Sequence, residues 1–459
     1  MHAQLDDDLA RMPELLKETQ AYAVRLLAGL GERPVAVTPV GREREPLPET
    51  GVGLTGAARV FARRWEPGFS ASAGPRYLGF VTGGVTPAAL AGDWLTSTLD
   101  QNPVSGVDSS APDLERETIG WLRELFGLSA AHEGTFVSGA TMSNVAGLAI
   151  AREWLAERAG ISVAEEGMAA LGKVSVLSGS PHSSIGKALS LLGFGRSAIN
   201  RIGVCAGREA VDVERLGQAL DALQGRPAIV VANAGTVNTV DFDDLRAIAA
   251  LRGRYPFWLH VDAAFGGFAA LSPEHARLVA GLDEADSVCV DLHKWLNVPY
   301  DSAVQFTRRR DLQARVFQNA AAYLGPLGDD PDFVHLTPEN SRRLRALPAW
   351  FTLMAYGRSG HAEIVRRDIA LAARLGELIA QMPAYRLLAP VRLNVVCFTL
   401  VSSPEKVGEL SRAITDSGKA FLTPTVYQGV PALRAAFSNW ATTRTDVDRV
   451  AEMLERLAP

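Results

Sequence analysis

A lysine stands directly after a short apolar run that is typical of a buried strand. The run SVCV (287–290) is followed by DLHK, which contains His293 and Lys294. An ammonium group beside a buried strand end costs free energy unless its charge is paired or removed. A lysine whose amine forms an imine with a carbonyl compound no longer carries that cost. The sequence therefore raises a catalytic lysine as the alternative to an ordinary surface turn.

Three further apolar runs also end in polar residues. The run FWLHV leads to Asp262, and a carboxylate at a buried strand end needs a cationic or N–H partner. The run KVSVLS leads to His182, although a lone histidine is more often structural. The run AIVVAN leads to Thr236 in a glycine-containing turn, and Asp243 and Asp244 beyond it are typical of charge at the start of a helix.

A fourth segment, SGATMSN (138–144), opens a helix with small residues. Gly139, Ala140 and Thr141 leave backbone N–H groups free to meet a phosphate, and the hydroxyls of Thr141 and Ser143 could add to them. The same residue types also begin ordinary helices, so this segment alone is weak evidence for a ligand.

The elements that carry these residues belong to one kind of fold. Short apolar runs alternate with helical patterns such as Leu114, Thr118, Leu122 and Leu125. This alternation predicts α/β units around a mostly parallel sheet with helices on both faces. Ligands of such sheets bind at the carboxyl ends of the strands. The lysine, the carboxylate, the histidine and the phosphate-binding turn are therefore expected at one edge.

One cofactor needs all four groups. Pyridoxal 5′-phosphate (PLP) forms a Schiff base with a lysine, and a carboxylate keeps its pyridine nitrogen protonated so that the ring can accept electrons. It also needs a phosphate site and a flat group against its ring. Lys294, Asp262, the turn at 139–143 and His182 could supply these in turn.

The length of 459 residues exceeds what a single hydrophobic core usually holds, about 250–300 residues. We predict three parts: an N-terminal helical arm over 1–75, a large PLP-binding α/β domain over 76–335 and a small C-terminal α+β domain over 336–459. The arm is expected to contain a helix from Pro13 to about Leu30.

The predicted C-terminal domain begins with long helices. Its pattern indicates helices at 341–356 and 359–381, strands near 395–401 and 432–438, and a last helix over 446–457. Thr445 stands three residues before Asp448, a spacing that resembles a capping box for that helix.

Composition argues against several functions. The formal net charge is −5 with a pI near 6.0, and no basic cluster suits nucleic acid. The arm is acidic and lacks a DNA-binding helical module, which disfavours a PLP-binding regulator. No apolar stretch reaches the ~20 residues of a membrane span, and no signal peptide is visible. Cys205, Cys289 and Cys397 match neither a disulfide framework nor a metal site, so we expect a cytoplasmic protein.

Longer motifs carry a resemblance. HVDAAFGG and DLHKWLNVPYDSA, with PHSSIGKA upstream and NAGTVNTVDFDDL between, resemble the group II PLP-dependent amino-acid decarboxylases, the family of aromatic-amino-acid and glutamate decarboxylases. The similarity extends from about Pro75 to Trp440 and includes SRRLRALPAWFTL and LRAAFSNWATT. The segment FVTGGVT (80–86) falls where the family has its substrate-binding loop. The resemblance implies a fold-type-I PLP-dependent transferase fold, a homodimer with active sites at the subunit interface, and decarboxylation of an L-amino acid to an amine and CO₂.

The resemblance also implies residue roles around the cofactor ring. Lys294 would hold PLP, and Asp262 would pair with the pyridine nitrogen. His182 would stack above the ring, and Ala264 would pack beneath it. Thr236 would contact the cofactor or the substrate side.

At the phosphate, the resemblance implies Ala140 and Thr141 with Gly139 beside them, and His293 nearby. Asp291 departs from the family pattern, since many relatives carry asparagine there. An anion close to a phosphate is repulsive unless a cation or a proton intervenes. We therefore expect Asp291 either to turn away from the phosphate or to bond to backbone N–H groups.

The donor of the proton that returns to the substrate carbon is a second departure. The family usually supplies it from a tyrosine on a mobile loop before an Arg-Arg pair, but counting back from Arg342 and Arg343 reaches Phe333. Phenylalanine at that site is associated with aldehyde synthases. Tyr323 and His335 are alternative donors, and an aldehyde synthase or a PLP-dependent carbon–carbon lyase is the alternative to plain decarboxylation.

Two arginines remain candidates, Arg345 and Arg434. The apolar residues around Arg434 favour a structural role, in an internal ion pair or at an interface.

Overall fold

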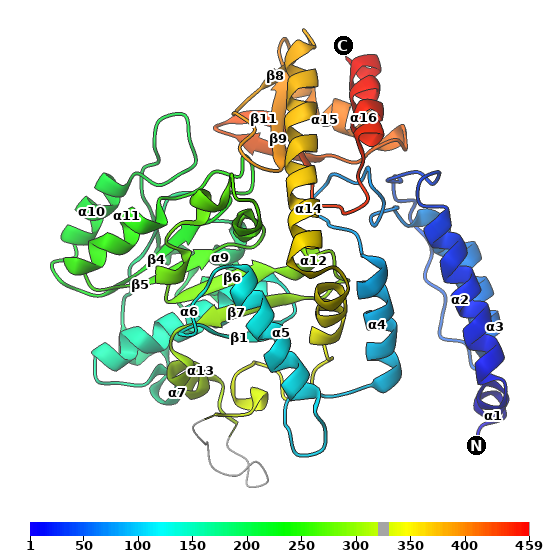
Figure 1. Cartoon of the computed structure of the whole chain (residues 1–459), viewed down its shortest axis with the longest axis horizontal. Helices are drawn as coiled ribbons and strands as arrows, with labels where there is room; N and C mark the ends of the chain where they lie inside the picture. Colours follow the sequence, from blue (N-terminus) through cyan, green and yellow to red (C-terminus); the bar gives the residue numbers. More distant parts are fainter. Residues whose placement is uncertain (320–329, 459) are drawn as a thin grey trace.

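The computed structural model describes residues 1–319 and 330–458. Its centre is a seven-stranded sheet with the strand order β1-β7-β6-β5-β4-β2-β3 (Figure 1). The strands are β1 (Glu133–Val137), β2 (Val176–Ser178), β3 (Ile199–Arg201), β4 (Ala228–Asn233), β5 (Phe257–Asp262), β6 (Ser287–Asp291) and β7 (Ala303–Thr307). Strands β3, β2, β4, β5 and β6 run parallel, and β7 is antiparallel to β1 and β6. The predicted mostly parallel sheet is confirmed.

Helices cover both faces of this sheet. The α-helices between residues 111 and 317 are α5 (Ala111–Leu125), α6 (Ala140–Arg158), α7 (Val163–Glu166), α8 (Met168–Leu171), α9 (Ser183–Leu191), α10 (Val213–Asp221), α11 (Leu245–Ala250), α12 (Leu292–Trp295) and α13 (Arg310–Phe317). Alternate residues of β4 point to opposite faces, because side chains alternate along a strand. Ile229 packs in one cluster with Leu148 of α6, while Val230 packs in another with Ile248 of α11. Burial on both faces explains why the strand sequences are almost continuously apolar.

The C-terminal part contains a four-stranded antiparallel sheet with the order β10-β11-β9-β8. Its strands are β8 (Tyr385–Leu387), β9 (Val395–Leu400), β10 (Thr423–Tyr427) and β11 (Val430–Ala436), and its later helices are α15 (Val407–Asp416) and α16 (Arg444–Leu457). The capping box of α16 consists of Thr443 and Asp446. The prediction of Thr445 and Asp448 was wrong, because the helix begins two residues before the predicted start.

A long helix, α14 (Ala346–Gln381), joins the two sheets. The two helices predicted for this stretch are parts of this one element, which breaks at Gly357, where φ is 59° and ψ is −176°. Its first part packs on α4 (Pro87–Leu99) and α5, and it also contacts α16 and β8. The predicted domain boundaries stay a prediction, but α14 connects the two larger units in Figure 1.

The N-terminal arm stands apart from the central sheet (Figure 1). It contains α1 (Ala3–Ala10), α2 (Met12–Ala28) and α3 (Gly53–Arg64), in which Leu15 is the one buried residue. The helix predicted from Pro13 to about Leu30 corresponds to α2. Within residues 1–319 and 330–458, no helix is both long and apolar enough to cross a membrane.

Candidate active site

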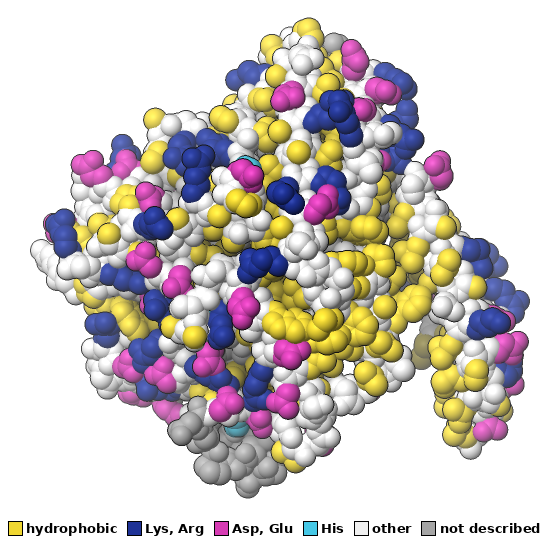
Figure 2. All heavy atoms as spheres, viewed as in Figure 1, with side chains coloured by type: hydrophobic (Ala, Val, Ile, Leu, Met, Phe, Trp, Pro, Cys, Tyr) yellow, Lys and Arg dark blue, Asp and Glu magenta, His cyan; other side chains and the backbone are white. Residues whose placement is uncertain are grey.

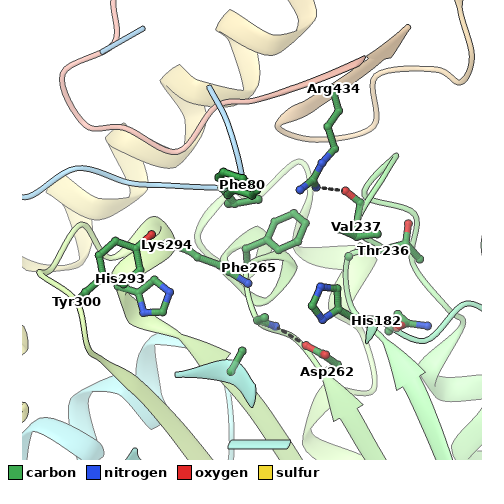
Figure 3. A pocket seen from close by; sticks show the side chains of 15 residues that line it. Phe80, His182, Thr236, Val237, Asp262, Phe265, His293, Lys294, Tyr300 and Arg434 are labelled. Carbon is green, nitrogen blue, oxygen red and sulfur yellow. Dashed lines mark hydrogen bonds between the residues drawn. The ribbon is translucent and has the colours of Figure 1, made fainter. Parts of the chain in front are cut away.

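The carboxyl ends of β4, β5 and β6 and the first turn of α6 open into one cavity of about 260 Å³ (Figure 3). Seven of the nine predicted site residues line it: Ala140, His182, Thr236, Asp262, Ala264, His293 and Lys294. The other two, Gly139 and Thr141, flank Ala140 at the start of α6. The structure therefore brings the predicted residues together, and their individual roles stay predictions.

Lys294 lies on α12, the single helical turn that follows β6. Its side chain is 17% exposed, and its Nζ is 3.2 Å from Asp291 Oδ2. The same nitrogen lies 5.5 Å from the centre of the Phe265 ring. The lysine that looked costly in the sequence is thus paired with a carboxylate. Figure 3 shows its side chain among the residues that line the cavity.

Asp262 ends β5 and is held by fixed donors. Its Oδ2 accepts a hydrogen bond from Asn144 Nδ2 at 3.0 Å, and its Oδ1 accepts one from the Ala264 amide at 3.2 Å. Asn144 Oδ1 accepts in turn from His260 Nε2 at 2.9 Å. Burial lowers the pKa of His260 to about 4, so this ring is neutral at pH 7. The chain of bonds orients a carboxylate that can hold a protonated ring nitrogen.

His182 precedes α9 as its N-cap residue. Its Nδ1 accepts from the Ser184 amide at 3.3 Å and lies 2.8 Å from Ser184 Oγ. Burial lowers the pKa of His182, which favours the neutral ring. A neutral, flat imidazole whose orientation is set by its own helix suits stacking against a ligand ring.

The expected phosphate end contains Asp291. Its Oδ1 accepts a hydrogen bond from the Ala140 amide at 3.2 Å, so Asp291 takes the second of the two arrangements expected from the sequence. His293 Nδ1 lies 3.2 Å from the same oxygen and 3.1 Å from the Ser302 carbonyl oxygen. Burial lowers the pKa of His293. A carboxylate therefore stands among the groups that were expected to bind phosphate.

Thr236 at the opposite end is held by a carboxylate behind it. Its Oγ1 donates to Glu209 Oε2 at 2.6 Å, and Thr239 Oγ1 donates to the same oxygen at 2.7 Å. Asn238 Nδ2 donates to the other oxygen of Glu209 at 3.2 Å. Glu209, which the sequence analysis missed, thus fixes the loop that carries Thr236.

Arg434 of β11 reaches the same cavity from the C-terminal sheet. It is 6% exposed, and its Nη1 donates to the carbonyl oxygen of Val237. No carboxylate among residues 1–319 and 330–458 forms an ion pair with Arg434, whereas Arg345 pairs with Asp301 and Glu339. Of the two structural roles expected for Arg434, the internal ion pair is wrong within these residues, and the place at an interface stays a prediction.

Three aromatic rings that were not predicted from the sequence also line the cavity, those of Phe80, Phe265 and Tyr300. The Tyr300 ring lies against the His293 ring with centres 4.2 Å apart. Its hydroxyl is 3.3 Å from Thr82 Oγ1. The signals available were the position of Phe80 in the loop at 80–86 and that of Tyr300 six residues after the lysine.

Phe333, at the position expected for the proton donor, and His335, an alternative donor, both lie away from the cavity. Phe333 is buried with the guanidinium groups of Arg116 and Arg342 over its ring. His335 is buried, and its Nδ1 accepts from the Asn319 amide at 3.1 Å. Neither lines the cavity formed by this chain. Tyr323 lies outside the described residues.

The cavity suits PLP in its donor set. It combines a lysine amine, an oriented carboxylate, a neutral imidazole and the amide end of the 19-residue helix α6. Residues 61–401 match the family model described as the pyridoxal-dependent decarboxylase conserved domain. The chain belongs to the pyridoxal-dependent decarboxylase family.

Individual relatives agree with this assignment. The chain is 28% identical over 400 residues to an aromatic-L-amino-acid decarboxylase of Bacillus atrophaeus, covering 84% of this chain and 81% of the relative. It is 30% identical over 427 residues to an L-2,4-diaminobutyrate decarboxylase of Rhizobium meliloti, covering 90% and 84%. The predicted family, its PLP cofactor and the decarboxylation of an amino acid to an amine and CO₂ are confirmed.

Solved structures confirm the predicted fold. The structure of Oryza sativa TDC with PLP and tryptamine matches with a TM-score of 0.90 at 23% identity, over 98% of both chains. A Rhodiola rosea 4-hydroxyphenylacetaldehyde synthase matches with a TM-score of 0.89 at 22% identity, also over 98% of both chains. At these identities the likeness concerns the fold alone.

Proposed function

We propose that this decarboxylase acts on an L-amino acid with an aromatic side chain. The observation that carries the proposal is the lining of the cavity around Lys294, where Phe80, Phe265 and Tyr300 supply three aromatic rings. Aromatic rings favour one another in stacked or edge-to-face contact. The Bacillus atrophaeus relative, an aromatic-L-amino-acid decarboxylase, supports the same substrate class.

The charges of the cavity support this choice over a substrate with a second amine. Asp262 is the one carboxylate among the described lining residues, and both of its oxygens already accept hydrogen bonds. A side-chain ammonium, as in 2,4-diaminobutyrate, would need a carboxylate of its own in a partly buried site. The cavity provides none among these lining residues.

The proposed roles follow from the positions of the side chains. When bound, PLP supplies a ring that accepts the electron pair left by the departing carboxylate. Lys294 would hold its carbonyl carbon, and Asp262 would keep a proton on its pyridine nitrogen. His182 and Ala264 would keep the ring flat between them, and Thr236 would contact its edge or the substrate.

Arg434 would recognise the carboxylate of the incoming amino acid. Its guanidinium is buried at the cavity and bonded to a backbone carbonyl, so it retains donors for an anion. Guanidinium groups suit carboxylates because two N–H groups can meet two oxygens. Figure 3 places Arg434 beside Phe80, at the side of the cavity away from Asp262.

We also propose a homodimer that works in the cytoplasm. Hydrophobic side chains gather along the arm and over the neighbouring part of the molecule in Figure 2. Exposed examples are Leu5, Leu9, Leu16, Val24 and Leu27 on the arm and Trp94, Leu95 and Leu99 on α4. Patches of this kind mark protein interfaces, and a second copy would cover them. The free cysteines suit a reducing compartment.

Product analysis tests the reaction and its substrate together. Purified protein is incubated separately with aromatic L-amino acids, glutamate and 2,4-diaminobutyrate, while CO₂, amine, aldehyde and peroxide are measured. We expect CO₂ and an aromatic amine in equal amounts without peroxide. Stoichiometric peroxide and aldehyde, or a preference for diaminobutyrate, would contradict the proposal. Lys294→Ala should abolish the product and the visible absorbance band of bound PLP.

Light scattering tests the assembly. The wild-type chain should have the mass of two copies, and Leu95→Glu or Leu16→Lys should shift it toward one copy. A wild-type mass of one copy at micromolar concentration would refute the homodimer.

A further inference from the structure

Asp291 has three nitrogen neighbours around its carboxylate. It is 2% exposed at the end of β6. One oxygen accepts from the Ala140 amide at 3.2 Å and lies 3.2 Å from His293 Nδ1. The other lies 3.2 Å from Lys294 Nζ. The carboxylate therefore holds a backbone donor at the start of α6 and pairs with the lysine of the site.

The position of this donor is the important feature. The first amides of a helix have no partner within the helix, and together with the helix dipole they attract anions. In α6 the first helical residue is Ala140, which follows Gly139 in extended conformation. Asp291 is thus an anion that the chain itself places at the end where the PLP phosphate is expected.

Two anions at one helix end oppose each other. The repulsion is strong in a partly buried site, because water screens it weakly there. Burial lowers the pKa of His293, so this ring adds no reliable positive charge between them at neutral pH. The third nitrogen neighbour of Asp291, Lys294 Nζ, belongs to the residue that would hold the other end of PLP.

We propose that Asp291 weakens the binding of the PLP phosphate, by competing for the Ala140 amide and by its charge. Because PLP then binds less tightly, the fraction of enzyme molecules that carry PLP depends on the concentration of free PLP. The inference rests on the proposed phosphate position at residues 139–141, and the experiment below tests that position separately.

The decisive comparison uses PLP and pyridoxal, which differ by the phosphate. Dissociation constants of both are measured on the protein stripped of cofactor, by the visible absorbance band and the quenching of tryptophan fluorescence. Asp291→Asn removes the charge, and the amide oxygen can still accept from Ala140. We expect PLP to bind about 10-fold tighter or more and pyridoxal to change little. If the substitution also changes how the Lys294 amine reacts, the dissociation constants of PLP and pyridoxal change by the same factor. Such a change cancels in the ratio of the two constants.

Two variants serve as controls. Asp311→Asn makes the same charge change on α13, where the carboxylate pairs with Arg309 outside the cavity, and should leave both constants unchanged. Ala140→Pro removes the shared amide at a helix position that tolerates proline, and should weaken PLP binding relative to pyridoxal. If the ratio of the PLP and pyridoxal dissociation constants is unchanged in Ala140→Pro, the phosphate does not bind at residues 139–141. The inference would then be wrong, because it rests on that position.

The remaining outcomes are equally decisive. If Asp291→Asn binds PLP with unchanged or lower affinity, or tightens PLP and pyridoxal by the same factor, the proposal is wrong. Inorganic phosphate provides an independent probe. With PLP held at the same multiple of its dissociation constant for each protein, inorganic phosphate should displace it from Asp291→Asn at a concentration about 10-fold lower than from the wild type. Melting temperatures of the stripped proteins show whether each variant is folded.

Discussion

Gly83 touches the backbone of Lys294 and offers a sharp test of how the lysine is positioned. A Cβ atom at residue 83 would lie 1.7 Å from the Lys294 carbonyl oxygen and 2.6 Å from Asn297 Nδ2. Asn297 Nδ2 also donates to the carbonyl oxygens of Gly83 at 2.5 Å and Ser438 at 2.6 Å. The loop at 80–86 and the turn of α12 are therefore in direct contact, and Gly83→Ala cannot keep both in place.

The size of the effect follows from these distances. Real Cβ contacts are hardly ever below 3.0 Å, so a contact at 1.7 Å requires the two backbones to separate by more than 1 Å. A displacement of about 1 Å in a catalytic group can lower the rate about 100-fold. Overpacking costs a further ~1–3 kcal/mol of the free energy of unfolding.

The assay compares kcat/KM for amine release, the visible absorbance of bound PLP and the urea-induced unfolding of Gly83→Ala and Gly120→Ala. Gly120 lies in α5, and a Cβ there would meet no atom within 4 Å. Gly120→Ala should keep its activity and gain ~0.5–1 kcal/mol of stability, because alanine favours a helix. If Gly83→Ala released amine as fast as this control, the contact between Gly83 and the Lys294 backbone would not position the lysine.

Three other predictions concern buried polar groups. Asn144→Leu should lower kcat/KM roughly tenfold or more, because Asp262 loses a hydrogen-bond donor worth about 1–3 kcal/mol. An unchanged rate and an unchanged PLP absorbance would show that Asn144 does not orient Asp262. Arg342→Met should lower the free energy of unfolding by about 3–5 kcal/mol, because the Glu115 carboxylate, bonded at 2.7 and 2.8 Å, stays buried and unpaired. In denaturant titration, the double variant Arg342→Met/Glu115→Leu should have a higher free energy of unfolding than the single variant Arg342→Met. Equal values for the two would contradict the prediction. The pKa of His260 is lowered from 6.5 to about 4, so its neutral form stabilises the fold above pH 6.5. This contribution, about 3 kcal/mol, should be lost as the pH falls from 6.5 toward 4. The free energy of unfolding of His260→Asn should fall less over that range than that of the wild type. An identical fall in both proteins would exclude His260 as the source of the pH dependence.

Much of the site could be predicted because its central residues follow strands directly. Lys294 and Asp262 come within a few residues of β6 and β5, whose apolar runs are plain in the sequence. Parallel strands bring their carboxyl ends to one edge, so local patterns were enough to predict that these side chains meet. The long motifs around them predicted the family and the cofactor.

Neighbouring residues of one type can still have different roles. In the sequence, Asp243 and Asp244 both resemble charge at the start of a helix. Asp244 does cap α11, accepting from the Ala247 amide at 3.0 Å. Asp243 is instead buried, accepting from the amides of Val211 at 2.6 Å and Asn233 at 2.7 Å. Which of two adjacent carboxylates faces the interior depends on the packing of a distant loop.

Local sequence patterns were enough to establish the α/β class, the family and the lysine, carboxylate and histidine of the site, because such patterns encode strands and the residues that follow them. Only the tertiary structure placed Arg434 in the cavity and Asp291 on the Ala140 amide, which lies 151 positions away along the chain. It also buried Phe333 away from the cavity. These contacts join segments far apart in the sequence, and their geometry follows from how sheets and helices pack, which no local pattern of residues specifies.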